Sequence, residues 1–327
     1  MNFRSFHFAF CAASSLFTSS IQAQDKVVAY VPNWIDLKAF AETIDYAKLT
    51  HINIAFENPT NASGDLSFNE GDRTLIAKAH ANKVKVLVSI GGGSASGDKV
   101  LKGRYSDLLG QEKRGAFAAK IADYVSTHEF DGLDVDIEGP SIDKNYGAFI
   151  DALAIALKPK GKLLTAALSK GYGGPQVPDS AIGRFDFVNI MAYDGAGYWE
   201  PDAPGQHSSI QFARSNVNYW LKRGLEKSRA VLGVPFYGYG FGAAFKQRDY
   251  PYSTIVAEYP EAKWRQDEVG ETIYYNGPQT IRRKTAYAMM NGLGGIMIWS
   301  LDYDVKGEGS LLSAIHAVFK KPAARKP

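Results

Sequence analysis

Eight short apolar runs recur along the chain, and a stretch with helical periodicity separates most neighbouring pairs. The runs are rich in Val, Ile and Tyr, and most of them end in Gly, polar or acidic residues. The stretches between them include 116–125 and 146–157, where apolar residues recur at i, i+3 and i+4, and a segment from 208 that opens with serines. The runs begin at residues 27, 50, 84, 131, 163, 186, 230 and 294.

Eight alternating strand and helix units predict a (β/α)8 barrel, and the alternative is an open, doubly wound sheet. The open sheet is disfavoured because no Gly-rich dinucleotide fingerprint follows the first run, and GGGS at 91–94 lacks the lysine of a phosphate loop. We see no linker or repeat that would divide the chain, so residues 24–327 are expected to form a single catalytic domain. The longest connection, 239–293, predicts an elaborated loop plus a helix.

The first residues have the pattern of a secretion signal, which we place at residues 1–23. Arg4 supplies the positive start, an apolar stretch follows, and Ala23 ends a run of small residues. The apolar stretch is too short to span a membrane, and we expect a secreted or periplasmic protein. Cys11 is the only cysteine, so the mature chain would contain no disulfide and no thiol nucleophile.

Charge gives little indication of a macromolecular partner. The 37 Lys and Arg residues nearly balance 34 Asp and Glu residues, and a net charge of +3 without a basic cluster does not predict nucleic-acid binding. The six histidines show no metal-ligand spacing, so we expect no metal and no cofactor. The expected state is a monomer.

The run DGLDVDIE places carboxylates where a structural strand would carry aliphatic residues. Asp134, Asp136 and Glu138 alternate with Leu, Val and Ile, so they share one face of the strand, which in a barrel would point inward. Buried carboxylates this close repel one another, and a neighbouring negative charge raises a carboxyl pKa. Glu138 lies nearest the C-terminal mouth, where a raised pKa would make it a proton donor. The alternatives are a solvated strand face and a calcium site.

This run resembles the DxxDxDxE signature of glycoside hydrolase family 18, the chitinase family, at all four acidic positions. The resemblance implies a substrate-assisted mechanism, in which the 2-acetamido oxygen of the sugar is the nucleophile and an oxazolinium ion is the intermediate. It implies that Glu138 protonates the glycosidic oxygen and later activates water. Asp136 would orient the acetamido group, Asp134 would hold or exchange a proton with it, and Asp131 would be structural.

Two further segments resemble the same family. MAYD ends with Tyr193 and Asp194, and the resemblance implies that Tyr193 bonds the acetamido oxygen while Asp194 contacts the sugar or the acid. Met191 belongs to the same segment and is expected to contact substrate. SIGG at 89–92 and the first strand place Ser89 and Tyr30 where the family hydrogen-bonds the inner aspartate. Ordinary buried strand-end residues are the alternative for these side chains.

Aromatic residues at other strand ends are expected to line sugar subsites. By the same resemblance Phe56 would form a subsite wall and Trp299 the floor beneath the cleaved sugar, with core packing as the alternative for both. Tyr237 is a plausible sugar contact, and Trp199 is expected to line a subsite. The family usually has arginine after Tyr-Gly, whereas this chain has Tyr239 there, which puts a charged contact at this position in doubt.

Three functions remain open at this point. The first is a chitinase acting on β-1,4 bonds between N-acetylglucosamine units, which the strand around Trp299 favours. The second is an endo-β-N-acetylglucosaminidase acting on N-glycans, and the third is a non-catalytic chitin-binding lectin. The third is disfavoured because Asp136 and Glu138 are both present. The chain has no room for the large α+β insertion that deep-cleft members of the family carry after the seventh strand. By this resemblance we expect a shallow, open groove that favours internal cuts.

Overall fold

The protein is described by a computed structural model that covers residues 25–264, 267–270 and 272–320. Eight parallel strands close into a barrel in the spatial order β1-β12-β7-β6-β5-β4-β3-β2. Each strand coincides with one of the eight predicted runs, so the predicted (β/α)8 barrel is confirmed. The barrel strands are β1 (Lys26–Pro32), β2 (His51–Ala55), β3 (Lys85–Gly91), β4 (Gly132–Asp136), β5 (Leu163–Leu168), β6 (Phe187–Ile190), β7 (Ala230–Pro235) and β12 (Gly295–Trp299).

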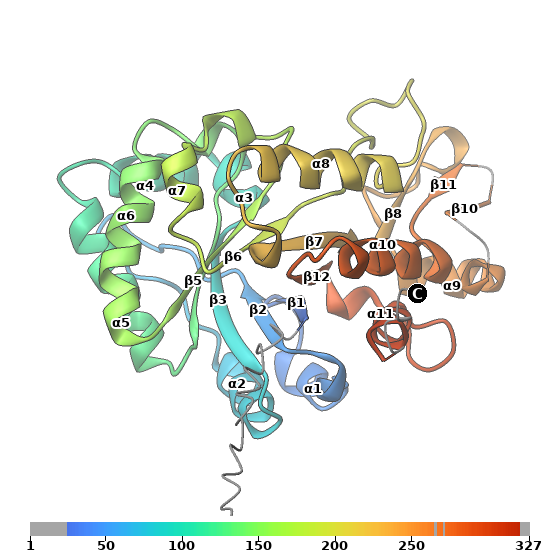
Figure 1. Cartoon of the computed structure of the whole chain (residues 1–327), viewed down its shortest axis with the longest axis horizontal. Coiled ribbons are helices and arrows are strands. Elements are labelled where there is room, and N and C mark those ends of the chain that lie inside the picture. Colours follow the sequence, from blue (N-terminus) through green and yellow to red (C-terminus); the bar gives the residue numbers. More distant parts are fainter. Residues whose placement is uncertain (1–24, 265–266, 271, 321–327) are drawn as a thin grey trace, which may run out of the picture.

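Helices surround the barrel on its outer side (Figure 1). Four of them, α5, α6, α8 and α10, lie where the sequence predicts helices. The Ser209 hydroxyl accepts a hydrogen bond of 3.0 Å from the amide of Phe212 and so caps α8, as the serine signal indicates. The helices are α1 (Leu37–Ala41), α2 (Glu70–Ala81), α3 (Gly93–Gly97), α4 (Lys99–Leu108), α5 (Arg114–Thr127), α6 (Tyr146–Leu157), α7 (Asp179–Ile182), α8 (Ile210–Lys222), α9 (Tyr252–Glu258), α10 (Pro278–Met290) and α11 (Leu311–Phe319).

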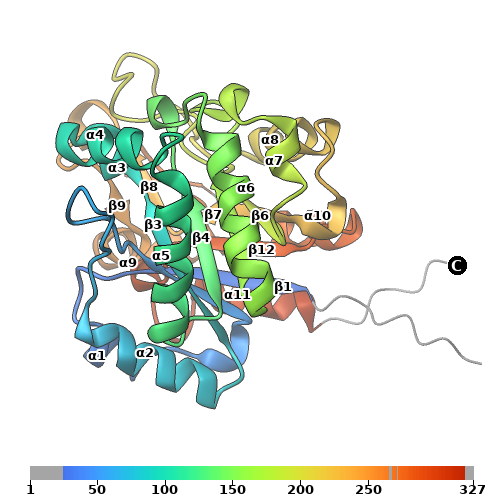
Figure 2. The same ribbon diagram turned by 90° about the vertical axis from the view of Figure 1, so that its left-hand side faces the viewer.

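The core has two layers separated by the barrel wall. The outer layer packs strands against helices, as Figure 2 shows for α5 and α6 in front of β3 and β4. The inner layer fills the barrel and reaches its mouth with aromatic and sulfur-containing side chains, among them Tyr30, Tyr193 and Met297. Alternate residues of each strand therefore face different environments, which is how one strand can carry an aliphatic face and a polar face.

The connection between β7 and α10 is more ordered than the sequence predicts. It forms a four-stranded antiparallel sheet with the order β10-β11-β8-β9, accompanied by helix α9. Three of these strands have two residues each, which is too few to show a period-two pattern. The sequence therefore predicted a loop here and did not predict the sheet. The insertion is small and sits at one side of the barrel (Figure 1). Its strands are β8 (Tyr237–Gly240), β9 (Tyr250–Pro251), β10 (Glu268–Val269) and β11 (Ile273–Tyr274).

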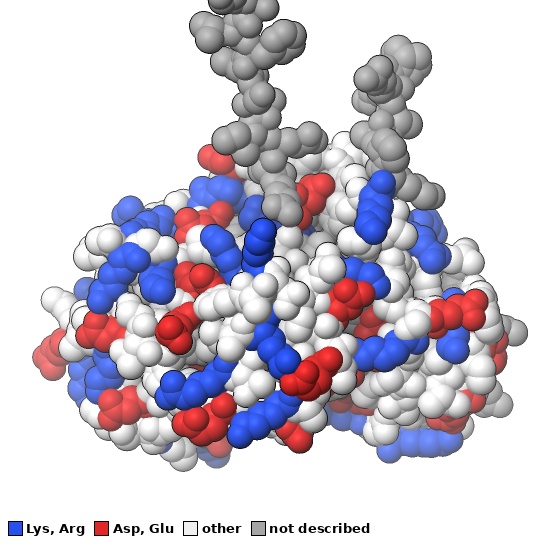
Figure 3. Space-filling model, turned by 90° about the horizontal axis from the view of Figure 1, so that it is seen from below, with Lys and Arg blue, Asp and Glu red and all other residues white. Residues whose placement is uncertain are grey.

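Charged side chains of both signs are interspersed on the face seen in Figure 3. Within the described part of the chain, no helix has the length and apolar character needed to cross a bilayer. The predicted signal at residues 1–23 lies outside the described residues.

Candidate active site

Strand β4 carries the carboxylates to the C-terminal mouth of the barrel. It ends at Asp136, and Glu138 follows as the residue that precedes a short 3-10 turn, Gly139–Ser141. Asp134 and Asp136 are buried, and the aliphatic residues between and beyond them belong to the outer core: Leu133, Val135 and Ile137. This burial pattern agrees with the inward carboxylate face that the sequence predicts.

Asp134 lies at the centre of the barrel and accepts hydrogen bonds from four other strands. The hydroxyls of Tyr30 and Ser89 donate to its Oδ2 over 2.6 and 2.8 Å. The hydroxyl of Thr165 and the amide of Asn189 donate to its Oδ1 over 2.6 and 3.2 Å. Burial raises the pKa of Asp134, and these hydrogen bonds act in the opposite direction. The sequence predicted the contacts of Tyr30 and Ser89 but missed Thr165 and Asn189, which are ordinary strand residues with no motif.

Asp136 lies one step nearer the mouth of the barrel and accepts fewer hydrogen bonds from the protein than Asp134 does. Its Oδ1 is buried and has no hydrogen-bond partner among the described residues. Burial and the neighbouring charges of Glu138 and Asp134 raise the pKa of Asp136 well above its usual range. Asp136 therefore holds a proton more readily than an ordinary aspartate and has an oxygen available for a ligand.

Glu138 has a pKa matched to proton donation near neutrality. Burial, followed by the charge of Asp194, raises its pKa to about 7. The hydroxyl of Ser96, on α3, donates to the backbone carbonyl of Glu138 over 2.7 Å and fixes the chain at this point. The arrangement supplies a carboxyl group that can give up a proton and take it back.

Tyr193 and Asp194 follow β6 and face the carboxylates. Asp194 has a φ of 59°, a left-handed conformation that Asp tolerates better than most residues. Its Oδ1 accepts hydrogen bonds from the hydroxyls of Tyr237 and Tyr239, the latter over 2.9 Å. The hydroxyl of Tyr193 lies 3.8 Å from the sulfur of Met297, a weak acceptor.

Three aromatic rings form one wall of the cleft. The rings of Phe56 and Trp299 are stacked with centroids 5.8 Å apart, and Trp34 stacks on Phe56 at 6.4 Å. The ring of Tyr30 is tilted against that of Trp299, with centroids 5.4 Å apart. Trp34 is 63% exposed, so it continues the wall outward into solvent. Trp34 closely follows the first strand, and this position could have indicated that it lines the cleft, but the sequence analysis did not identify it.

These groups enclose a cleft of about 570 Å³ at the mouth of the barrel. Eight predicted site residues line it: Phe56, Asp136, Glu138, Met191, Tyr193, Asp194, Tyr237 and Trp299. The other three, Asp134, Tyr30 and Ser89, lie beneath it, and Trp199 packs against Tyr239 without lining it. The sequence pointed to no role for several lining residues, namely Trp34, Gly93, Ser94, Gly97, Asp98, Arg248, Asp249 and Tyr303.

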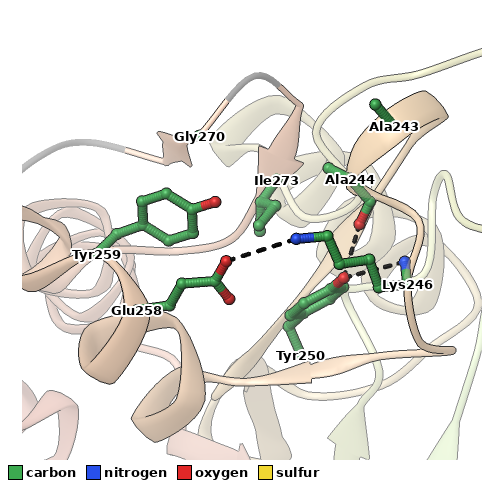
Figure 4. Close-up of a pocket in the computed structure, with 8 residues that line it drawn as sticks. All are labelled: Ala243, Ala244, Lys246, Tyr250, Glu258, Tyr259, Gly270 and Ile273. Carbon is green, nitrogen blue, oxygen red and sulfur yellow. Dashed lines mark hydrogen bonds and ion pairs between the residues drawn. The ribbon is translucent and has the colours of Figure 1, made fainter.

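A second hollow of about 370 Å³ lies within the insertion (Figure 4). Its one carboxylate, Glu258, is 3.8 Å from the ammonium of Lys246. Lys246 and Tyr250 face this hollow, while Arg248 and Asp249 between them line the main cleft. The hollow lacks the clustered carboxyl groups of the main cleft, which is therefore the candidate active site. Across the described residues, no group of three or more His, Cys, Asp or Glu side chains is arranged to hold a metal ion.

The family model of glycosyl hydrolases family 18 matches residues 26–304, which span the whole barrel. The chain belongs to this family. The predicted family is confirmed, and the family together with the chitinases among the relatives makes the protein a glycoside hydrolase, in agreement with the raised pKa of Glu138 at the cleft.

Relatives in family 18 cover most of this chain. The GH18 chitinase ChiB from the chitin utilization locus of Flavobacterium johnsoniae is 36% identical, with a TM-score of 0.81 over 90% of this chain and 94% of that one. A chitinase from Bacteroides thetaiotaomicron is 26% identical, with a TM-score of 0.79 over 90% and 96% of the two chains. Mouse chitotriosidase-1 is 27% identical over 85% of this chain and 73% of its own length. A probable chitinase 10 of Drosophila melanogaster is a much longer protein, of which the match spans 15%.

Proposed function

We propose that the protein is a chitinase that hydrolyses β-1,4 bonds between N-acetylglucosamine units with retention of configuration. The observation that carries the proposal is the carboxyl ladder of β4, which ends in a Glu138 with a pKa of about 7 inside an aromatic cleft. Chitinases among the relatives, including one that is 36% identical, support chitin as the substrate. Family resemblance supplies the substrate-assisted route.

In this mechanism Glu138 acts twice. Its proton passes to the glycosidic oxygen as the bond from that oxygen to the anomeric carbon breaks. The acetamido oxygen of the same sugar forms a new bond to the anomeric carbon, which gives an oxazolinium ion. Water then attacks this carbon, the Glu138 carboxylate takes the proton of the water, and the carbon–acetamido bond breaks. Two inversions at one carbon give net retention.

Asp136 and Tyr193 position the acetamido group. The unpartnered Oδ1 of Asp136 can accept the acetamido N–H and stabilise the positive charge that develops on the ring. The Tyr193 hydroxyl, held only by the weak acceptor Met297 among the described residues, can donate to the acetamido oxygen. Asp134 is fixed by four donors, and its charge is one of the causes that raise the pKa of Asp136, which favours the protonated form of Asp136 at the start of the cycle.

The aromatic wall favours a chain of pyranose rings as the ligand. Trp34, Phe56 and Trp299 present successive faces to the apolar C–H surfaces of sugars. The small insertion gives a groove that we propose is open and suited to internal cuts. We also propose that residues 1–23 direct export and that the barrel from residue 24 acts outside the cytoplasm as a monomer.

The test is Glu138→Gln on soluble chito-oligosaccharides, with Glu112→Gln, an exposed carboxylate, as the matched control. We expect Glu138→Gln to lower kcat by about 10²–10⁴-fold and to retain oligosaccharide binding, while the control retains activity. Wild-type protein that binds but never cleaves these oligomers would refute catalysis. Release of glycans from a high-mannose glycoprotein without action on chito-oligomers would refute the chitinase assignment. Cellulose oligomers cut as fast as chitin oligomers would refute the substrate-assisted route.

A further inference from the structure

Asp194 is an acidic residue surrounded by neutral donors. Tyr237 and Tyr239 stand two residues apart on β8, so both side chains lie on one face of the strand, and both hydroxyls reach Oδ1 of Asp194. Burial and the charge of Asp194 raise the pKa of both phenols, so they remain protonated and donate at any working pH. Two hydrogen bonds to one carboxylate oxygen stabilise the charged form of that carboxylate.

His207 contacts the same carboxylate and adds no charge. Its ring is fully buried, and burial lowers its pKa. Its Nδ1 lies 3.7 Å from Oδ1 of Asp194 and accepts a hydrogen bond of 3.4 Å from the Asp194 amide. Burial outweighs the hydrogen bond and the charge of Asp194, which both raise the pKa of His207, so the net shift favours the neutral ring.

The cations near this cluster are directed elsewhere. Lys284, on α10, is buried with a pKa lowered to about 7, and its ammonium bonds Ser208 and Asn276. The guanidinium of Arg248 lies 5.2 Å from the centre of the Tyr198 ring, and the adjacent Asp249 is acidic. Among the described residues, no Lys or Arg forms an ion pair with Asp194.

Other acids line the cleft that Asp194 lines. Glu138 and Asp136 line the same cleft from the end of β4. After burial, the charge of Asp194 is the cause that raises the pKa of Glu138. An anion that lacks a counter-ion and stands beside an acid disfavours ionisation of that acid.

We infer that Tyr239 is a positioning residue for the catalytic acid: with Tyr237 it fixes the Asp194 carboxylate in the cleft that Glu138 also lines, and the carboxylate held there sets the pH range over which Glu138 can donate its proton. The inference rests on the proposed role of Glu138 as the acid. Tyr239 is neutral, and a guanidinium in its place would cancel the charge that Asp194 exerts on Glu138. The neutral tyrosine thus extends the pH range over which the acid holds its proton.

The test compares Tyr239→Arg, Tyr239→Phe and Asp194→Asn with wild type, and uses Tyr250→Phe as the control. Tyr250 is a buried tyrosine of the same small sheet whose hydroxyl bonds Ala244 and Lys246 away from the cleft. The first readout is a carboxyl ¹³C NMR titration of glutamate-labelled protein, in which Glu138→Gln identifies the resonance of Glu138. This readout needs no turnover. The second readout is the basic limb of the pH profile of kcat/KM on a chito-oligosaccharide.

We expect the largest change in Asp194→Asn, where the titration midpoint of the Glu138 carboxyl should fall by about one pH unit or more. Tyr239→Arg should reproduce most of this shift by charge compensation. Tyr239→Phe should give a smaller shift in the same direction, because Asp194, whose side chain is 44% exposed, becomes free to turn toward solvent. Tyr250→Phe should leave the midpoint unchanged.

Three outcomes overturn the inference. An unchanged midpoint in Asp194→Asn shows that Asp194 does not act on Glu138. If the Glu138 midpoint shifts in Asp194→Asn but in neither Tyr239 variant, Tyr239 has no part in setting it. A shift of equal size in Tyr250→Phe assigns the effect to the sheet as a whole. Absence of turnover in wild type counts against the proposed function only, since the NMR midpoints are still measured.

Discussion

Asp134→Ala removes the acceptor of four hydrogen bonds at the centre of the barrel. The donors are buried and come from four strands: Tyr30, Ser89, Thr165 and Asn189. Each unsatisfied buried donor costs about 1–3 kcal/mol, so a simple sum is about 4–12 kcal/mol. Two effects reduce it: Tyr30 and Asn189 are already 3.3 Å apart and can bond each other, and the variant no longer buries a carboxylate. We expect a loss of about 3–5 kcal/mol in the free energy of unfolding.

The assay is urea unfolding followed by tryptophan fluorescence at pH 7. Asp134→Asn keeps one acceptor oxygen and should lose about 2 kcal/mol, while Ser89→Ala deletes one donor and should lose about 1 kcal/mol. The order of the three variants matters more than any single value, because it follows from the number of donors left without a partner. If Asp134→Ala is no less stable than Ser89→Ala, the hydrogen bonds at the barrel centre do not stabilise the fold as argued.

Other predictions follow from the cleft. Gly92 has a φ of 72°, and in Gly92→Ala the new Cβ would lie 2.3 Å from the Phe56 ring. Because the ring must then move, we expect steady-state kinetics to show a KM for chito-oligosaccharides raised about tenfold, with a smaller change in kcat. An unchanged KM would contradict this. Trp34→Ala should weaken calorimetric binding of long oligomers by about 1 kcal/mol and spare the shortest, whereas equal losses at all lengths would contradict a role as an outer wall. Because the pKa of Glu138 is raised from 4.5 to about 7, its ionisation opposes folding above pH 4.5. Glu138→Gln should therefore match wild type in stability at pH 4 and exceed it by roughly 1–3 kcal/mol at pH 8, and a difference independent of pH would contradict the raised pKa.

The barrel and the carboxylate face followed from the sequence because both depend on periodicity within one element. A strand repeats every two residues, so the alternation around Asp134, Asp136 and Glu138 fixes their common face before any tertiary contact exists. The helices of 116–125 and 146–157 are equally local, since an apolar stripe of period 3.6 specifies them. The small sheet of the insertion escaped prediction because strands of two residues contain no period to detect.

The sequence by itself determined the barrel, the strand that carries the acids and the order of the acids along it. Only the tertiary structure decided most of the groups that surround each acid. These groups come from several elements: Tyr239 and His207 at Asp194, Thr165 and Asn189 at Asp134, and Trp34 beside Phe56. Their approach depends on how the barrel closes and where its loops run. The pKa of Glu138 depends on burial and on the charge of Asp194, which follows a different strand, so it is a property of the folded chain and not of the DGLDVDIE run.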